Sequence, residues 1–149
     1  MLNNKIPPVV VVVFFAAVMA LIAHYTVIDF SAFITYLSLA LVATGCIFCI
    51  AGVVSFRFAK TTVLPNKPEQ ASSLVTSGVY KFSRNPMYLG FLLFLIALGV
   101  FLASLYSFLL PALFIPYMNK FQIEPEEKSM QDMFGSEYSD YAMRVRRWV

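Results

Sequence analysis

The sequence predicts an all-α integral membrane protein, a single domain over residues 1–149. We expect about four transmembrane helices in two hairpins, followed by a cytoplasmic C-terminal helical segment. The chain is 60% hydrophobic and only 13% charged, whereas soluble domains average about 45 to 50% apolar and about 25% charged residues. Apolar stretches at 9–28, 32–56 and 87–118 each reach the length of about 20 residues that crosses a hydrocarbon core.

The first two helices are expected at residues 7–28 and 32–56. Pro7 and Pro8 suit a helix start, where the first N–H groups have no partner within the helix. Ser31 can cap the second helix with its hydroxyl. The first apolar run is too long for the apolar region of a cleaved signal peptide, and we therefore expect a retained helix.

The third apolar stretch is expected to fold back on itself. Its 32 residues would form a helix about 48 Å long, whereas the hydrocarbon core is about 30 Å thick. A break near Phe101 to Tyr106 gives two helices, at residues 86–102 and 105–121. Gly45, Gly52 and Gly99 provide small surfaces on which membrane helices pack closely.

The eleven Lys and Arg residues predict the topology. One precedes the first apolar stretch, five lie between the second and third stretches, and five follow the third. The two short turns within the hairpins contain none. Because basic residues gather on the cytoplasmic side, we expect a multi-pass protein of the bacterial inner (plasma) membrane with both termini in the cytoplasm.

Several classes of site are excluded by composition. One histidine and two cysteines cannot supply the three or four nitrogen and sulfur ligands of a zinc-type site, so no metal is expected. No two glycines are separated by one residue, which excludes a G-x-G-x-x-G dinucleotide loop. Orientation and lipid headgroups explain the basic residues, so nucleic acid is not expected as a partner. Cys46 and Cys49 are expected to pack as small apolar side chains.

The first polar segment, residues 72–90, contains a helix start at the membrane surface. Asn85 and Pro86 form a capping pair in which asparagine precedes a first-turn proline. A helix start presents free N–H groups and a partial positive charge to a carboxylate or phosphate, and Arg84 lies beside it. Spacing alone leaves a second interpretation open, in which Asn85 is only a cap and Arg84 only a membrane-surface anchor.

The second polar segment, residues 124–149, is expected to form two helices. Pro125 can open the first, with Glu126 and Glu127 in its first turn, where acidic residues favour the helix dipole without any function. Gly135 can end this helix and Ser136 can cap the next. The final helix then carries an interfacial packing face made of Tyr138, Tyr141, Val145 and Trp148.

Together the two segments resemble a known family. The runs LVTSGVYKFSRNPMYLG and EPEEKSMQDMFGSEYSDYAMRV closely resemble the isoprenylcysteine carboxyl methyltransferase family of membrane enzymes, which is itself similar to the phospholipid N-methyltransferases. The resemblance covers roughly residues 70–149. Two positions depart from the eukaryotic members, which have histidine where this chain has Asn85 and arginine where it has Gln122. A bacterial-type relative with another acceptor fits this pattern better.

The resemblance implies methyl transfer from S-adenosylmethionine to a lipophilic acceptor at the cytoplasmic face. The implied partners are a lipophilic small molecule or lipidated acceptor and membrane lipids. The cofactor pocket would lie between the helix after the first motif and the segment that carries the second. Carried over by motif position, the implied cofactor-binding residues are Ser73, Leu74, Val75, Tyr80, Asn85, Pro86, Met87, Tyr88 and Glu126. The implied catalytic residues are Arg84, Asn85, Tyr88 and Glu127.

Three alternatives remain open: a phospholipid or other lipid-amine N-methyltransferase, an NADPH-dependent membrane reductase, and a non-catalytic membrane scaffold. The acceptor chemistry distinguishes the two methyltransferases. A carboxylate is already deprotonated at neutral pH, whereas an amine must lose a proton before it attacks. The implied pocket contains no histidine or lysine, and this favours a carboxylate acceptor.

Overall fold

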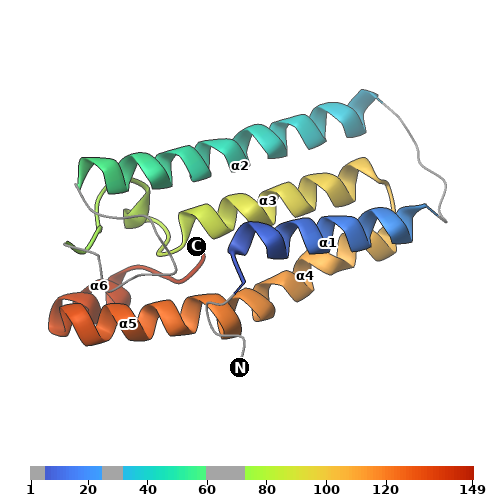
Figure 1. The fold of residues 1–149 in the computed structure, drawn as a ribbon. Helices are drawn as coiled ribbons and strands as arrows, with labels where there is room; N and C mark the ends of the chain where they lie inside the picture. Colours follow the sequence, from blue (N-terminus) through green and yellow to red (C-terminus); the bar gives the residue numbers. More distant parts are fainter. Residues whose placement is uncertain (1–5, 25–31, 60–72) are drawn as a thin grey trace.

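A computed structural model describes residues 6–24, 32–59 and 73–149. The expected all-α class is confirmed, because the described part of the chain contains helices and connecting segments and no strand. The helices, shown in Figure 1, are α1 (Pro8–Ala23), α2 (Ala32–Phe58), the 3₁₀ turn η2 (Gly78–Lys81), α3 (Pro86–Phe101), α4 (Leu105–Met118), the π-helical turn η3 (Asn119–Ile123), α5 (Glu124–Phe134) and α6 (Ser136–Arg144).

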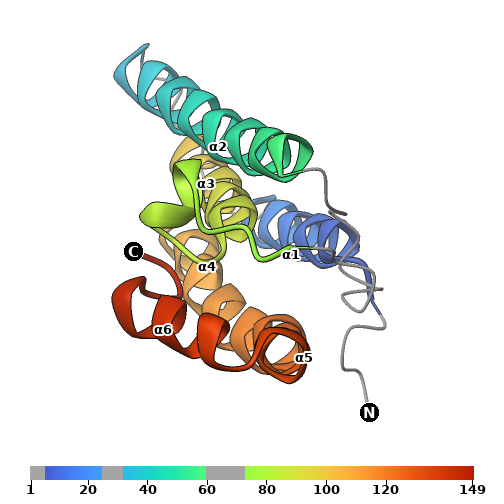
Figure 2. The same ribbon diagram turned by 90° about the vertical axis from the view of Figure 1, so that its left-hand side faces the viewer.

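Four long helices run side by side, and the short ones gather at one end. Helix α3 is central, since it packs against α2, α1 and α4. Figure 2, which looks along the helices, shows α2, α3 and α4 in succession with α1 beside them. Helix α5 continues α4 past the end of the bundle, and α6 folds back beside it near η2 and the start of α3 (Figure 1).

The core lies between α1, α3 and α4. Its fully buried side chains include Met19, Leu95 and Phe114. The ring of Phe15 meets that of Phe114 edge to face at 5.6 Å between centroids. The buried Ser107 hydroxyl donates to the Met19 carbonyl at 2.9 Å, so this polar group is satisfied inside an apolar core.

Helices α2 and α3 approach closely because glycines face each other. A Cβ atom added at Gly90 would lie 2.7 Å from the Gly45 carbonyl oxygen and 2.5 Å from Cys49 Sγ. Cys49 thus packs in this interface, as expected, whereas Cys46 is exposed and the prediction for it is wrong. At the other end of the interface, the space left by Gly52 is filled by Met87.

The predicted boundaries hold for most helices and fail at two places. Pro7 and Pro8 occupy the N-cap and first position of α1, and the break after Phe101 is present. The predicted first helix to residue 28 is too long, since α1 ends at Ala23, and the Ser31 cap lies outside the described residues. The predicted stop at residue 121 is also wrong, because α4 ends at Met118 and passes through the π-helical turn into α5.

Among the residues that the structure describes, one helix, α2, is long and apolar enough to cross a membrane, while α1 and α3 are apolar but shorter. The structure therefore supports one span by length, and four crossings stay a prediction. Many large apolar side chains of α1, α2 and α4 are exposed, among them Phe14, Leu21, Phe33, Ile47 and Leu113. Exposed apolar surface of this extent is typical of a protein that contacts lipid or a partner.

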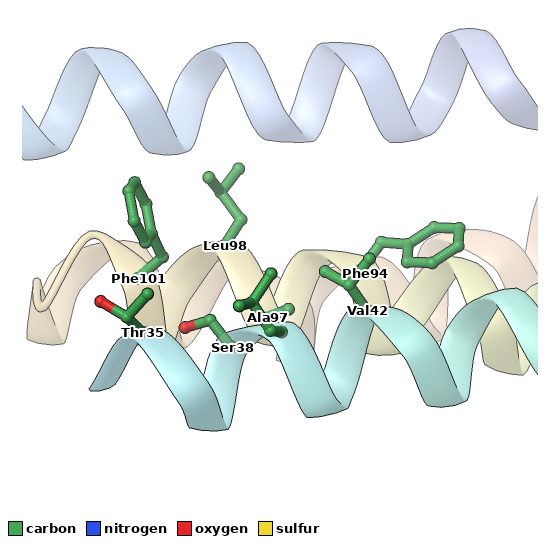
Figure 3. A pocket seen from close by; sticks show the side chains of 8 residues that line it. Thr35, Ser38, Val42, Phe94, Ala97, Leu98 and Phe101 are labelled. Carbon is green, nitrogen blue, oxygen red and sulfur yellow. The ribbon is translucent and has the colours of Figure 1, made fainter. Parts of the chain in front are cut away.

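A lateral groove opens between α2 and α3 (Figure 3). Its walls are almost entirely apolar, and the Ser38 hydroxyl that faces it already donates to the Ile34 carbonyl at 2.9 Å. The groove lies on the half of α3 that follows Phe94, away from the helix start. Its lining residues are Thr35, Ser38, Leu39, Val42, Phe94, Ala97, Leu98 and Phe101.

Candidate functional site

The two motifs meet at the end of the bundle where α5 and α6 gather. Tyr88 lies in the first turn of α3 and Glu126 in the first turn of α5. The Tyr88 hydroxyl donates a hydrogen bond to Glu126 Oε1 at 2.6 Å, although 38 residues separate the two along the chain. Tyr88 is only 6% exposed, so it makes this contact as a buried side chain.

Glu126 titrates close to neutral pH. The pKa of its carboxyl is raised to about 7, chiefly by burial; the hydrogen bond from Tyr88 opposes this shift, and the neighbouring Glu127 charge adds to it. A buried carboxyl without a cation beside it favours its neutral form. Glu126 therefore changes its charge in the pH range in which a cell works.

Glu127, the next residue, has the opposite environment. Its Oε1 accepts from Arg84 Nη2 at 2.6 Å and its Oε2 from Arg147 Nη2 at 2.6 Å. Arg147 Nε adds a third hydrogen bond at 3.1 Å. Burial alone would raise the pKa of Glu127, but the hydrogen bonds and charges of Arg147 and Arg84 together hold it below its usual value.

The Arg84 side chain is 14% exposed and is bound by groups of the protein. Besides its ion pair with Glu127, its Nη1 donates to the carbonyls of Ala142 at 2.9 Å and Val145 at 2.8 Å, at the end of α6. The last carbonyls of a helix lack partners and carry partial negative charge, which an arginine neutralises. Arg84 is therefore neither a membrane-surface anchor nor a free charge beside the helix start.

Asn85 occupies the N-cap position of α3, as predicted, but its side chain does not cap the helix. Its Nδ2 donates instead to the Arg147 carbonyl at 2.9 Å, and its backbone N–H donates to Ser83 Oγ at 3.1 Å. The prediction of a side-chain cap is therefore wrong. Within the described part of the chain, no side chain caps the first-turn N–H groups of Met87 and Tyr88.

Tyr80 lies close to the Tyr88–Glu126 pair. It is buried, its ring meets Phe56 edge to face at 5.4 Å, and its carbonyl accepts from the Tyr141 hydroxyl at 2.8 Å. Burial raises the pKa of Tyr80, and the charges of Tyr141 and Glu126 add to this shift. Glu126 therefore acts on Tyr80 as well as on Tyr88.

The other predicted cofactor residues lie around the Tyr88–Glu126 pair, and their contacts differ. Ser73 Oγ donates to the Ala59 carbonyl at 3.2 Å, which ties the segment before η2 to the end of α2. Val75 is buried and Leu74 half-buried. Pro86 and Met87 border the space left by Gly52 on α2, so their side chains support the α2–α3 interface.

The last helix differs from its prediction at both ends. Gly135 is the N-cap of α6 and Ser136 its first helical residue, so the predicted Ser136 cap is wrong. Tyr138 and Tyr141 are buried on one face of α6, as expected. The helix ends at Arg144, so the predicted extension of that face over Val145 and Trp148 is wrong. Trp148 Nε1 instead donates to Asn119 Oδ1 at 2.9 Å.

Sequence reasoning missed Arg147 as a site residue. Its guanidinium holds Glu127 and its carbonyl holds Asn85, whereas the sequence pattern placed it only among the charges that orient the membrane protein. A carbonyl contact leaves no sequence signal, because every residue has that group. The acidic residue of a pair predicts a basic partner, but it does not say which of the eleven basic residues that partner is.

Comparison with known proteins identifies the family. The family model for phospholipid methyltransferases matches residues 33–137. A rice protein named probable protein-S-isoprenylcysteine O-methyltransferase (Oryza sativa subsp. japonica) is 31% identical over 113 residues, which cover 76% of this chain and 59% of that protein. The mouse (Mus musculus) protein-S-isoprenylcysteine O-methyltransferase is 33% identical over 119 residues, covering 75% of this chain and 41% of that protein.

The yeast (Saccharomyces cerevisiae) protein of the same name is 32% identical over 111 residues, covering 68% of this chain and 45% of that protein. The chain spans about three fifths of the length of the rice relatives, 59%. No solved structure gives a significant match. The resemblance predicted from the two motifs is confirmed: the chain belongs to the phospholipid methyltransferase family, and it is similar to proteins named protein-S-isoprenylcysteine O-methyltransferases.

Proposed function

We propose that this chain is an S-adenosylmethionine-dependent methyltransferase that acts on a lipophilic acceptor at the cytoplasmic face of a membrane. The observation that carries the proposal is the contact between Tyr88 and Glu126, at which two motifs far apart in sequence form one site. The names of the relatives, protein-S-isoprenylcysteine O-methyltransferases, support an isoprenylcysteine carboxylate as the acceptor.

The described residues suit the cofactor at three points. The first-turn N–H groups of Met87 and Tyr88, which no side chain caps, suit the methionine carboxylate. Glu126 suits the ammonium or ribose hydroxyl groups, because an ionised carboxylate accepts hydrogen bonds. The rings of Tyr80 and Tyr88 suit the adenine or the sulfonium cation. When bound, the cofactor supplies an electrophilic methyl group.

The residues of the chain then act by holding the cofactor and the acceptor and by orienting them toward each other. A bimolecular displacement gains most of its rate from alignment of the two reactants and from exclusion of water. Tyr88 is buried and fixed by its hydrogen bond to Glu126. A carboxylate acceptor needs no general base, so this arrangement is sufficient for methyl ester formation.

The lateral groove suits the apolar chain of the acceptor. Tyr88 and the groove residues Phe94 and Phe101 all lie on α3, and the helix rises about 9 Å from Tyr88 to Phe94 and about 20 Å to Phe101. An isoprenoid chain can therefore lie along α3 while its head group is at the start of the helix. The apolar walls of the groove favour this placement by the hydrophobic effect.

A lipid amine is the second candidate acceptor, and one observation favours it. Gln122 stands where the eukaryotic members have arginine, and it is 1% exposed. Its Nε2 donates to the Ile6 carbonyl at 2.7 Å, so it holds the start of α1 and does not offer a charge to an acceptor carboxylate. The chemical stability of the product separates the two acceptors.

The topology completes the proposal. We place the two termini and residues 57–86 in the cytoplasm of a bacterium and the hairpin turns on the other side of its inner membrane. The support is the distribution of basic residues, none of which lies in either hairpin turn. The site then faces the compartment where the cofactor is made.

The first prediction compares Glu126 with the adjacent Glu127, which serves as its matched control. Glu126→Gln should weaken binding of S-adenosylhomocysteine at least tenfold in calorimetric titration, because the accepting carboxylate is lost. The same variant should be more stable than the wild type at pH 8. Burial raises the folded-state pKa of Glu126 to about 7 from its ordinary value of 4.5, so the unfolded chain loses this proton at a lower pH than the folded protein. Stability therefore falls between about pH 4.5 and pH 7, and at pH 8 the full cost is about 3 kcal/mol.

This gain in stability should vanish at pH 4, where the Glu126 carboxyl is protonated in both folded and unfolded chains. Glu127→Gln should instead lower the melting temperature at pH 8, because Arg84 and Arg147 lose their shared partner. Wild-type affinity for S-adenosylhomocysteine in the Glu126→Gln variant would remove Glu126 from the cofactor site.

The second prediction concerns the reaction. Membranes that contain the chain should transfer labelled methyl from S-adenosylmethionine to a farnesylcysteine acceptor, and mild base should release the label, as it does from a methyl ester. Tyr88→Phe should lower kcat/KM about tenfold, whereas Tyr106→Phe, at an exposed position outside the site, should not. Label that survives base as an N-methyl group on lipid would favour the lipid-amine acceptor.

The third prediction tests the groove. Val42→Trp should raise KM for a farnesylated acceptor severalfold without changing cofactor affinity, because the added ring fills the space between α2 and α3. Val54→Trp is the matched control, since both valines lie on α2 and are 39% exposed but only Val42 lines the groove. Equal KM values in the two variants would place the acceptor chain elsewhere.

The fourth prediction concerns topology. In a variant without Cys46 and Cys49, single cysteines introduced at Phe30 and at Tyr106 should both react with an impermeant thiol reagent added outside the cell. A cysteine introduced at Lys81 should react only after the membrane is opened. Labelling at position 30 without labelling at position 106 would contradict four crossings.

A further inference from the structure

The chain after α6 crosses the start of α3. The Arg84 backbone N–H donates to the Arg146 carbonyl at 3.0 Å, and the Arg84 side chain donates to the Val145 carbonyl at 2.8 Å. Figure 1 shows the C-terminus beside the first turn of α3. The last residues therefore form a strap, residues 145–147, across the first motif.

Arg147 is the residue of this strap that touches both motifs. Its carbonyl accepts from Asn85 Nδ2 at 2.9 Å and from Ser83 Oγ at 3.5 Å. Its guanidinium donates to Glu127 through Nη2 at 2.6 Å and Nε at 3.1 Å. The two hydrogen bonds reach the two carboxylate oxygens, which is the bidentate geometry that fixes direction as well as distance.

These contacts adjoin the Tyr88–Glu126 pair on both sides. Asn85 immediately precedes α3, whose first turn carries Tyr88, and Glu127 follows Glu126 on α5. A displacement of about 1 Å in a site that aligns two reactants can cost about a hundredfold in rate. The protein therefore has to fix the distance between the first turn of α3 and the first turn of α5.

We propose that Arg147 is a positioning residue that fixes the first turn of α3 against the first turn of α5 and so sets the geometry of the Tyr88–Glu126 pair. The proposal rests on the proposed function, because it assigns the residue that positions that same site. Arg147 acts through Asn85 and Glu127 and does not itself contact the cofactor.

The charge of Arg147 has a second effect on the pair. The groups that face Glu126 are Tyr88 from α3, Tyr80 from η2, Tyr138 from α6 and Glu127 from α5. Glu127 in turn faces Arg84 and Arg147, and Glu124 lies 3.8 Å from Arg147. Loss of the Arg147 charge leaves the Glu127 carboxylate less compensated, and ionisation of Glu126 beside it then becomes harder.

The test compares three variants. Arg147→Gln removes both the charge and the bidentate contact with Glu127. Arg147→Lys keeps the charge but loses the planar guanidinium that makes the bidentate contact. Arg144→Gln is the matched control, because it removes an equal charge from the end of α6, where the Arg144 Nε donates to the Asp140 carbonyl of its own helix. Carbon-13 NMR of the Glu126 carboxyl in the cofactor-free protein, followed against pH, reports the charges that surround Glu126, and the affinity for S-adenosylhomocysteine reports the geometry of the site.

We expect Arg147→Gln to move the Glu126 titration midpoint upward and to raise the dissociation constant of S-adenosylhomocysteine about tenfold. Arg147→Lys should keep the wild-type midpoint and lose severalfold in affinity, and Arg144→Gln should match the wild type in both. A wild-type midpoint and wild-type affinity in Arg147→Gln would overturn the proposal. If Arg147→Gln does not fold, wild-type affinity in Arg147→Lys would overturn it.

The failure of the proposed function gives a different result. In that case the wild-type chain does not bind S-adenosylhomocysteine, while the Glu126 midpoint still moves upward in Arg147→Gln and not in Arg144→Gln. The midpoint therefore tests whether the Arg147 charge acts on Glu126 through Glu127, and the binding of S-adenosylhomocysteine by the wild type tests the function.

Discussion

The carboxylate of Glu127 is the group on which the rest of the site depends. It binds Arg84, which precedes α3 and holds the end of α6, and Arg147, which lies across the start of α3. One side chain of α5 thus joins α3, α6 and the C-terminal strap. The side chains of this network are partly buried, with Arg84 14% and Glu127 19% exposed. Removal of one member leaves another charge with fewer partners, which costs more than the loss of a fully exposed ion pair.

Two adjacent glutamates of one helix turn consequently have opposite properties. Glu127 lies between two guanidinium groups and its pKa is lowered, whereas Glu126 faces tyrosines and its pKa is raised to about 7. Glu127 stabilises the fold in its charged form, and charging Glu126 opposes folding. Groups whose pKa is shifted by an unfavourable environment are found most often at functional sites. The contrast therefore supports Glu126 rather than Glu127 as the residue that contacts the cofactor.

The sequence predicted the fold class and the break near Phe101, because hydrophobic length and charge are local properties of the chain. The meeting of the two motifs was implied by the family resemblance. It did not predict that Asn85 would leave its cap to bind the Arg147 carbonyl or that α4 would run into α5. Both outcomes depend on tertiary contacts. The role of Arg147 could not be predicted from the sequence either, because its main-chain carbonyl makes half of its hydrogen bonds.

The central claim is that the first turns of α3 and α5 form one cofactor site that the Glu127 network holds in place. An experimental structure of the chain with S-adenosylhomocysteine bound tests it most directly. The account predicts the ligand in contact with both Tyr88 and Glu126, with the Arg84–Glu127–Arg147 contacts intact. A ligand that lies away from these two residues, or one that binds only after Glu127 releases its arginines, would contradict it.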